Sequence, residues 1–502
     1  MKFQLKVRPV NVIFSRVLPS LGLVVCGIAL AQIPPGAGAL SRQIEREQPP
    51  GPPPKASPDI RLEQGAESVA PAAAGDVHAK LIVKSLHVAG IQVFPEAELL
   101  AVTGFRPQSE LTLADLRGMA SKIALHYHTH GYFLAQAYLP PQDIQNGAVT
   151  IAVIEGKYGT VSLRNQTNLS DALANGLLAG LNGGDTIAIA PLESRLLLLS
   201  DLPGVSVKST LVPGASVGAS DLIVDVTPGR RVTGSLDADN SGNRYTGENR
   251  IGATLNLNNP SGHGDVASLR ALTSGSGLNY ARASYQVQIS KAKVGVAYAS
   301  MKYRLGKEFD SLQANGTADI ASLYGALPLI RSRSSNLSVL LNYDFKSFQD
   351  KVDATSTVTD KKADVLMLSL AGDQRDGLGG GGLSQYALTW ASGRIDIRSP
   401  AALATDAATL RSNGHFDKLA INAMRLQSVT ASTSLYAAIN AQFASKNLDI
   451  SEQIGLGGAS GVRAYPAGEA YGDQGYVLNL EARYLLPTFS ERVPGRMQLV
   501  GF

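Results

Sequence analysis

Three alternate histidines, His126, His128 and His130, are residues whose type and spacing could bind a metal ion. They end the segment 112–131, in which apolar residues recur at helical spacing. On a helix His126 and His130 share a face, whereas His128 points elsewhere. Zinc would require further ligands that this segment does not supply. The pattern therefore predicts the end of a helix, and we expect no metal site.

The glycine run 377–382 resembles a phosphate-binding loop, but it lacks the Gly-Lys-Ser/Thr ending of such loops. Because it lies between two segments with the pattern of strands, a tight turn is the better interpretation. The chain has no His-Glu-x-x-His or Cys-x-x-Cys pattern. We find no catalytic constellation, and we expect neither enzymatic activity nor a cofactor.

Long segments from residue 229 onward alternate between apolar and polar residues, and the clearest are 336–346 and 476–485. This period of two places apolar side chains on one face of a strand and polar ones on the other. The segments are long enough to cross a bilayer as tilted strands, and Tyr and Phe recur near their ends. Charged residues occupy the polar face, namely Asp344, Lys346, Glu481 and Arg483. They suit a wet lumen better than a dry core. We therefore expect a mainly β fold, a transmembrane antiparallel β-barrel in outer-membrane lipid, with no amphipathic helix from 229 onward.

Two α+β modules precede this region. In 78–156, one strand at 81–90 is followed by two helices and two further strands, and 157–228 repeats this order. This common order indicates an internal repeat.

The N-terminal segment 1–31 has the pattern of a secretory signal peptide, with basic residues before a short apolar run that ends in Ala29-Leu30-Ala31. An uncleaved anchor is the alternative. Cleavage would remove the only cysteine, Cys26, and the four basic residues that account for the net charge of +4. A neutral mature chain gives no electrostatic signal for a nucleic-acid partner. Residues 32–77 combine a Pro-rich linker with a polar stretch, 41–48, that we expect to be helical only when docked on a surface.

Four longer stretches carry a resemblance to a known family. They are LLLLSDLPGVSVKSTLVPG (196–214), DNSGNRYTGENRIGATLNLNNPSGHGD (239–265), GDQRDGLGGGGLSQYALTWASGRID (372–396) and GLGGASGVRAYPAGEAYGDQGYVLNLEARYLLP (455–487). They resemble the outer-membrane transporters of two-partner secretion, the TpsB family of haemolysin and filamentous-haemagglutinin secretion/activation proteins. The resemblance implies POTRA 1 at 78–156, POTRA 2 at 157–228 and a barrel at 229–502. It also implies a place in the outer membrane of a Gram-negative cell, with the POTRA modules in the periplasm.

The family has a loop that folds into the barrel and carries a Val-Arg-Gly-Tyr or Val-Arg-Gly-Phe tip. The matching residues are Val462, Arg463, Ala464 and Tyr465. The resemblance implies that Arg463 lies in the lumen and pairs with an acid on the wall, a contact that could hold the loop in one position. Ala464 replaces the family's Gly and has a steric cost if that position needs a positive φ. Without the family, a solvated loop charge would be the ordinary interpretation of Arg463.

The number of strands departs from the family. From 229 we count about twelve strands and the start of a thirteenth at 496–502, whereas the family has sixteen. The family's thirteenth strand continues into a Phe-x-Asp-x-Gly pattern, whose Asp is the expected partner of the loop arginine, but this sequence stops at Phe502. We expect a C-terminally truncated barrel that lacks roughly 60–70 residues, and a genuinely shorter barrel is the alternative.

The resulting hypothesis is a protein transporter. Strand edges of the POTRA modules would capture an extended, unfolded exoprotein of the large β-helical type, which would cross the lumen and fold outside. The helix at 41–48 could plug the lumen at rest, and barrel assembly machinery would insert the protein into the membrane. The alternatives are an insertase of the same superfamily and a passive porin. Two POTRA modules favour secretion, because general insertases usually have more.

Overall fold

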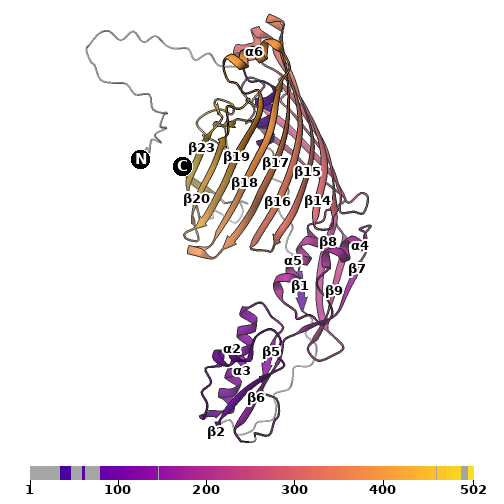
Figure 1. The fold of residues 1–502 in the computed structure, drawn as a ribbon, viewed down its shortest axis with the longest axis vertical. Helices are drawn as coiled ribbons and strands as arrows, with labels where there is room; N and C mark the ends of the chain where they lie inside the picture. The colour runs from indigo at the N-terminus through magenta and orange to yellow at the C-terminus, as the bar shows by residue number, and fades with distance from the viewer. Residues whose placement is uncertain (1–33, 47–58, 63–79, 145, 459–460, 488–495) are drawn as a thin grey trace, which may run out of the picture. The chain divides into compact units, whose positions relative to one another are not determined.

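The computed structural model describes residues 34–46, 59–62, 80–144, 146–458, 461–487 and 496–502 (Figure 1). The predicted signal peptide and most of the Pro-rich linker lie outside these residues. Within the described part of the chain, no helix is both long enough and apolar enough to cross a membrane.

POTRA 1 contains two helices packed on a small sheet. Its elements are β2 (Lys80–Val83), β3 (Ser85–Ala89), α2 (Glu96–Thr103), β4 (Ser109–Thr112), α3 (Leu113–Thr129), β5 (Gln136–Tyr138) and β6 (Ala148–Ile154). The sheet order is β3-β6-β5, and β2 pairs separately with β4. The helical spacing in α3 buries Leu116, Ala120, Ile123 and Tyr127 in the module's core.

The sequence predicted one strand at 81–90, and this prediction was wrong in detail. The strand is interrupted at Lys84, between β2 and β3, where the Lys84 backbone N–H donates to the Gly147 carbonyl at 2.8 Å. The break occurs because the two halves pair with different neighbours, β4 and β6.

POTRA 2 repeats the order strand, helix, helix, strand, strand that the sequence indicated. Its elements are β7 (Lys157–Asn165), α4 (Asp171–Leu178), α5 (Ile189–Ser200), β8 (Val205–Pro213) and β9 (Ala219–Pro228). The sheet order is β1-β8-β9-β7, in which β1 (Asp59–Leu62) comes from the segment that precedes POTRA 1. No pattern in the sequence predicted this additional strand.

A sheet of 13 antiparallel strands follows the two modules. The strands are β10 (Val232–Asp239), β11 (Arg250–Asn258), β12 (Val266–Thr273), β13 (Leu278–Ile289), β14 (Ala292–Arg304), β15 (Ala314–Arg331), β16 (Ser335–Val352), β17 (Thr357–Asp376), β18 (Gly382–Ile397), β19 (Gly414–Ser428), β20 (Thr433–Ala444), β23 (Gly475–Leu485) and β24 (Gln498–Gly501). Each strand pairs with its sequence neighbours, except that β20 pairs directly with β23. The loop between those two strands contains the short pair β21 (Ile454–Gly455) and β22 (Tyr471–Gly472).

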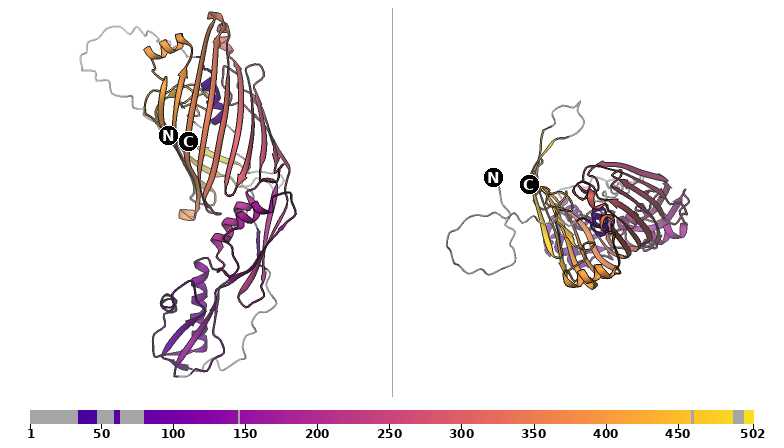
Figure 2. Two further views of the ribbon diagram at one scale, coloured as in Figure 1. Left: turned by 45° about the vertical axis from the view of Figure 1, so that its right-hand side comes forward. Right: turned by 90° about the horizontal axis from the view of Figure 1, so that it is seen from above.

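The alternation predicted from the sequence separates the two faces of this sheet. In β23, Tyr476, Leu478 and Leu480 are exposed, whereas Val477 and Glu481 are buried. Seen from above, the sheet is strongly curved, with α1 (Ala37–Arg46, indigo) on its concave side (Figure 2). The exposed apolar residues therefore form the lipid-facing surface and the polar residues face the lumen, as a transmembrane β-barrel requires.

The connection between β18 and β19 contains a short helix, α6 (Pro400–Ala408), which the sequence pattern did not predict. Pro400 stands at a helix start, where its missing N–H costs nothing, and alanines follow it. At the other end, Asp406 accepts hydrogen bonds from the backbone N–H groups of Ser412 and Asn413 at 2.9 and 3.0 Å. A helix stabilised by these local contacts needs no amphipathic pattern, so apolar periodicity does not indicate it.

A buried carboxylate organises the core of POTRA 1. Glu155 Oε1 accepts hydrogen bonds from the backbone N–H groups of Gln92 and Val93 at 2.7 and 2.8 Å, and from the Tyr127 hydroxyl at 2.8 Å. Burial, followed by the hydrogen bond to Glu155, raises the pKa of Tyr127 above its ordinary value.

We expect Glu155→Ala to lower the opening free energy of POTRA 1 by about 2–4 kcal/mol, because three donors, among them the buried Tyr127 hydroxyl, lose their acceptor. Glu155→Gln keeps a carbonyl oxygen in place and should cost less than half as much. Hydrogen exchange of the α3 and β6 amides in the full chain measures both effects. Equal losses in the two variants would contradict the assigned role.

Candidate functional site in the barrel lumen

The helix α1 is packed inside the barrel. Ala37, Leu40 and Ile44 recur at helical spacing and are buried in one cluster with residues of the barrel wall. The backbone N–H of Ala37 donates to Asp350 Oδ1 at 2.7 Å, which satisfies one of the donors at the helix start. The helix expected at 41–48 is therefore present and begins four residues earlier, at Ala37, while residues 47 and 48 lie outside the described part of the chain.

The helix lies against the loop that follows β20. The Arg42 guanidinium donates through Nε to the Gln453 carbonyl at 3.0 Å. A Cβ atom at Gly38 would come within 2.8 Å of Ser451 Cβ, so glycine permits this close approach. Helix and loop therefore fill the lumen as neighbouring segments.

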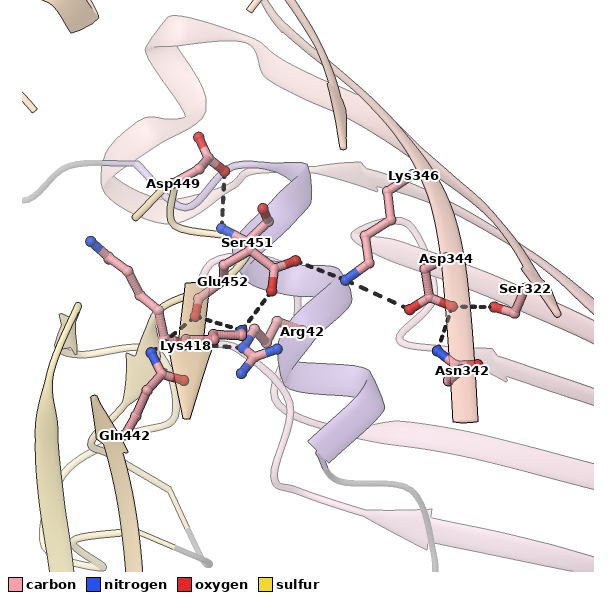
Figure 3. A network of polar contacts seen from close by, with 11 residues as sticks. Arg42, Ser322, Asn342, Asp344, Lys346, Lys418, Gln442, Asp449, Ser451 and Glu452 are labelled. Carbon is pink, nitrogen blue, oxygen red and sulfur yellow. Dashed lines mark hydrogen bonds and ion pairs between the residues drawn. The ribbon is translucent and has the colours of Figure 1, made fainter. Parts of the chain in front are cut away.

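Glu452, in the same loop, is held between two lysines of the barrel wall (Figure 3). Its two carboxylate oxygens lie 2.9 Å from Lys346 Nζ on β16 and 2.5 Å from Lys418 Nζ on β19. All three side chains are at most 5% exposed. Because each charge is desolvated, removing one partner would leave an uncompensated charge in a buried site.

The network extends along β16. Lys346 Nζ also lies 3.8 Å from Asp344 Oδ2, and Asp344 Oδ1 accepts hydrogen bonds from Ser322 and Asn342 at 2.7 and 2.8 Å. These contacts connect the loop with β15 and β16. The two strands lie on one side of Glu452, and Lys418 lies on the other (Figure 3). The loop thereby bridges the barrel wall.

The predicted loop motif lies further along the same connection. Arg463 donates to Glu481 Oε1 on β23, and Arg483 Nε donates to Glu481 Oε2 at 2.8 Å. Arg463 is half-exposed, whereas the Glu481 side chain is buried. The structure thus brings Arg463 to an acid on the wall, although that acid is Glu481 rather than an aspartate of a later strand.

The other three motif residues form the turn that presents Arg463. The Val462 N–H donates to the Leu456 carbonyl at 2.7 Å, and the Tyr465 N–H donates to the Val462 carbonyl at 3.0 Å. The side chains of Val462 and Tyr465 are exposed. Ala464 is not among the described residues with a positive φ, so the steric cost considered for an alanine there does not arise.

Sequence reasoning identified some of these residues but not their partners. Asp344, Lys346 and Glu481 were recognisable as the polar face of alternating strands. Lys418 and Glu452 were missed, because a lysine in a strand and a glutamate in a loop have no local signal that they meet. Such a pairing follows only from the curvature that brings β16, β19 and the loop together.

The three histidines of POTRA 1 have different hydrogen-bond partners, although the ring centroids of His126 and His130 lie 4.3 Å apart on the face that they share. His126 Nε2 is 3.0 Å from Glu98 Oε1, His128 Nε2 is 2.8 Å from the Ala135 carbonyl, and His130 Nδ1 is 2.8 Å from the His126 carbonyl. Among the residues that the structure describes, no group of three or more His, Cys, Asp or Glu residues could hold a metal ion.

Two family models match the chain. The model of the haemolysin secretion/activation proteins ShlB/FhaC/HecB matches residues 218–491, and a ShlB-type POTRA domain model matches residues 81–156. Taken with the fold, these matches define an outer-membrane protein transporter with periplasmic POTRA domains. The chain belongs to the haemolysin secretion/activation family, the transporters of two-partner secretion.

Relatives and solved structures agree with this family. The heme/hemopexin transporter protein HuxB of Haemophilus influenzae is 30% identical over 497 residues, which cover 97% of this chain and 86% of HuxB. The outer membrane transporter CdiB of Dickeya dadantii is 22% identical over 74% of this chain and 68% of its own. The solved structure of CdiB from Escherichia coli matches with a TM-score of 0.64 at 21% identity, covering 84% of this chain and 79% of CdiB. This structural match supports the fold alone.

We expect Glu452→Gln to destabilise the barrel by about 3–5 kcal/mol, because Lys346 and Lys418 lose their shared counter-charge. The double variant Lys418→Met/Glu452→Gln leaves Lys346 beside Asp344 and should be destabilised less. The midpoint of heat-induced unfolding, followed by the shift in SDS-gel migration, measures both. A double variant that unfolds at or below the temperature of the single variant would contradict the network.

Proposed function

We propose that this chain is the outer-membrane transporter of a two-partner secretion system and translocates an unfolded exoprotein of the large β-helical type. The observation that carries the proposal is the combination of two POTRA modules with a barrel whose polar lumen is filled by α1 and the inserted loop. A passive porin needs an open lumen, whereas a transporter needs a pore that stays closed until its cargo arrives.

The domain organisation that we propose follows from this assignment. Residues 32–77 contain the lumenal helix and the linker, residues 78–156 and 157–228 are the POTRA modules, and residues 229–502 form the barrel. The POTRA modules lie in the periplasm, where strand edges bind an extended chain through main-chain hydrogen bonds. The barrel strands then present a polar lumen to the cargo.

The resting pore is closed by α1. The helix buries three apolar side chains against the wall and contacts the Glu452 loop through Arg42. Both segments therefore occupy the space that a translocating chain requires. We infer that α1 must leave its site during transport and that the loop must shift with it.

The family is one of transporters rather than enzymes. An insertase is the alternative function, and a gene deletion distinguishes it from a transporter. Deleting the gene should remove the exoprotein encoded beside it from the culture medium, because no other pore would accept it. The abundance of other outer-membrane barrels should stay unchanged. Immunoblots of medium and outer-membrane fractions measure both quantities. Depletion of the other barrels with intact secretion would overturn the proposal in favour of an insertase.

We propose that Arg463 positions the inserted loop through Glu481, a partner whose side chain is buried. Arg463→Ala should reduce exoprotein secretion about tenfold, because the loop loses its charge-assisted hydrogen bond to the buried Glu481 carboxylate, which then keeps only Arg483. Arg463→Lys keeps the charge and should retain more activity. The amount of heat-modifiable barrel in the membrane controls for assembly. Secretion by Arg463→Ala at the wild-type level would contradict this role.

A further inference from the structure

POTRA 2 contacts the barrel at two turns, in addition to the covalent connection 229–231. β10 follows POTRA 2 directly and successive barrel strands alternate in direction, so the turns 259–265 and 332–334 lie at the end of the sheet where β10 starts. With the POTRA modules in the periplasm, this end is the periplasmic rim of the barrel. The two turns follow β11 and β15, which are four strand spacings or about 19 Å apart along the sheet.

The turn 259–265 packs against the start of α4 through uncharged groups. The Ser170 N–H, at the N-cap of α4, donates to the Gly262 carbonyl at 2.8 Å. Asn168 Nδ2 donates to the Asn259 carbonyl and Asn259 Nδ2 donates to Asn168 Oδ1, both at 3.0 Å. A Cβ atom at Gly262, where φ is +84°, would lie 2.3 Å from the Asn168 carbonyl oxygen. Only glycine therefore permits this approach of one backbone to another.

Asp265 holds the same turn in one conformation. Its carboxylate accepts hydrogen bonds from the backbone N–H groups of Ser261 and His263 at 3.2 and 3.3 Å, and from the Tyr285 hydroxyl on β13 at 2.7 Å. The Asp265 residue is fully buried, so losing these bonds would be costly. Because the turn is held in place by the barrel, moving POTRA 2 away requires breaking the contacts between the turn and α4.

Two ion pairs join α5 to the second turn. Arg331, the last residue of β15, donates to both carboxylate oxygens of Asp201, through Nε at 2.7 Å and Nη2 at 2.8 Å. Its Nη1 atom donates to Asn336 Oδ1 at 2.9 Å, which fixes the plane of the guanidinium. Arg333 Nε lies 2.5 Å from Glu193 Oε1. A bidentate pair in a fixed orientation is the kind of partly exposed ion pair that contributes to stability.

The position of Asp201 in α5 is explained by the barrel rather than by the helix. Asp201 is the C-cap residue, and its N–H donates to the Leu197 carbonyl at 2.8 Å. The last turn of α5 contains no basic residue. A carboxylate at this end of a helix is unfavourable, because the helix dipole places partial negative charge there. The Arg331 guanidinium offsets that charge, so α5 is suited to a POTRA 2 module that is docked on the barrel.

We propose that Asp201 and Arg331 are a positioning pair that holds POTRA 2 at the periplasmic rim, and that the exoprotein enters the lumen while this joint stays closed. The proposal rests on the proposed function for the identity of the transported chain. A swing of POTRA 2 about the connection 229–231 would separate α5 from the second turn and break both ion pairs. The closed joint keeps the captured segment at a high effective concentration beside the pore.

Reversing the charges tests the positioning role. Asp201→Lys places like charges together and should lower secretion of the co-expressed exoprotein about tenfold, since POTRA 2 no longer holds the captured segment at the pore. The double variant Asp201→Lys/Arg331→Glu has an opposite-charge pair again and should secrete within about threefold of the wild-type level. The amount of heat-modifiable barrel in the outer membrane controls for assembly. A double variant that secretes no more than Asp201→Lys would contradict the pairing.

A reversible covalent link tests whether the joint opens. Cys26 is the only native cysteine, so Glu193→Cys/Arg333→Cys is made with Cys26→Ser and leaves Asp201 and Arg331 unchanged. A short bifunctional methanethiosulfonate reagent joins the two thiols through disulfides with release of methanesulfinate, and dithiothreitol reduces them. Secretion by the linked chain should stay within about twofold of secretion by the reduced chain, because entry needs no separation of the joint. A larger fall that dithiothreitol reverses would overturn the proposal and indicate a gate.

The yield of this link in the purified chain, without exoprotein, reports on the joint itself. At limiting reagent, Asp201→Lys should lower the yield about fivefold, and adding Arg331→Glu should restore it. Equal yields with and without Asp201→Lys would also overturn the positioning pair. Failure of the proposed function has a different signature. In that case the wild-type chain would not secrete the exoprotein, while the yields would still follow the charges.

Discussion

The carboxylate of Glu452, held between Lys346 and Lys418, is the contact on which the arrangement of the lumen depends. A buried carboxylate between two wall lysines defines where the loop after β20 can lie, because moving it would separate the desolvated Glu452 carboxylate from both lysines and leave Lys346 with Asp344 alone. That loop in turn contacts Arg42 and allows the close approach of Gly38. The position of α1 is thus set by an electrostatic constraint as well as by its apolar face.

The same constraint explains why the lumen can be both polar and closed. Strands that cross a membrane alternate between lipid-facing and lumen-facing residues, so the inner surface is rich in charges. Segments that fill such a lumen must present complementary charges and hydrogen bonds. The inserted loop does so through Glu452, which pairs with lysines on β16 and β19, and through Arg463, which pairs with an acid on β23.

The linker extends this logic to the periplasm. Its strand β1 occupies the edge of POTRA 2 while α1 occupies the lumen, and both belong to one short stretch of chain.

The sequence by itself determined the classes of structure. A period of two from residue 229 onward predicted a membrane-spanning sheet, and the repeated order of elements predicted two α+β modules, because both patterns are local. The resemblance to a known family predicted that Arg463 lies in the lumen and pairs with an acid on the wall. The tertiary structure alone decided which charges and which strands meet. Glu481 pairs with Arg463 and Glu452 with two distant lysines, and strand β1 pairs with β8. These contacts join residues far apart in the chain, and they depend on sheet curvature and on chain paths that no local pattern encodes.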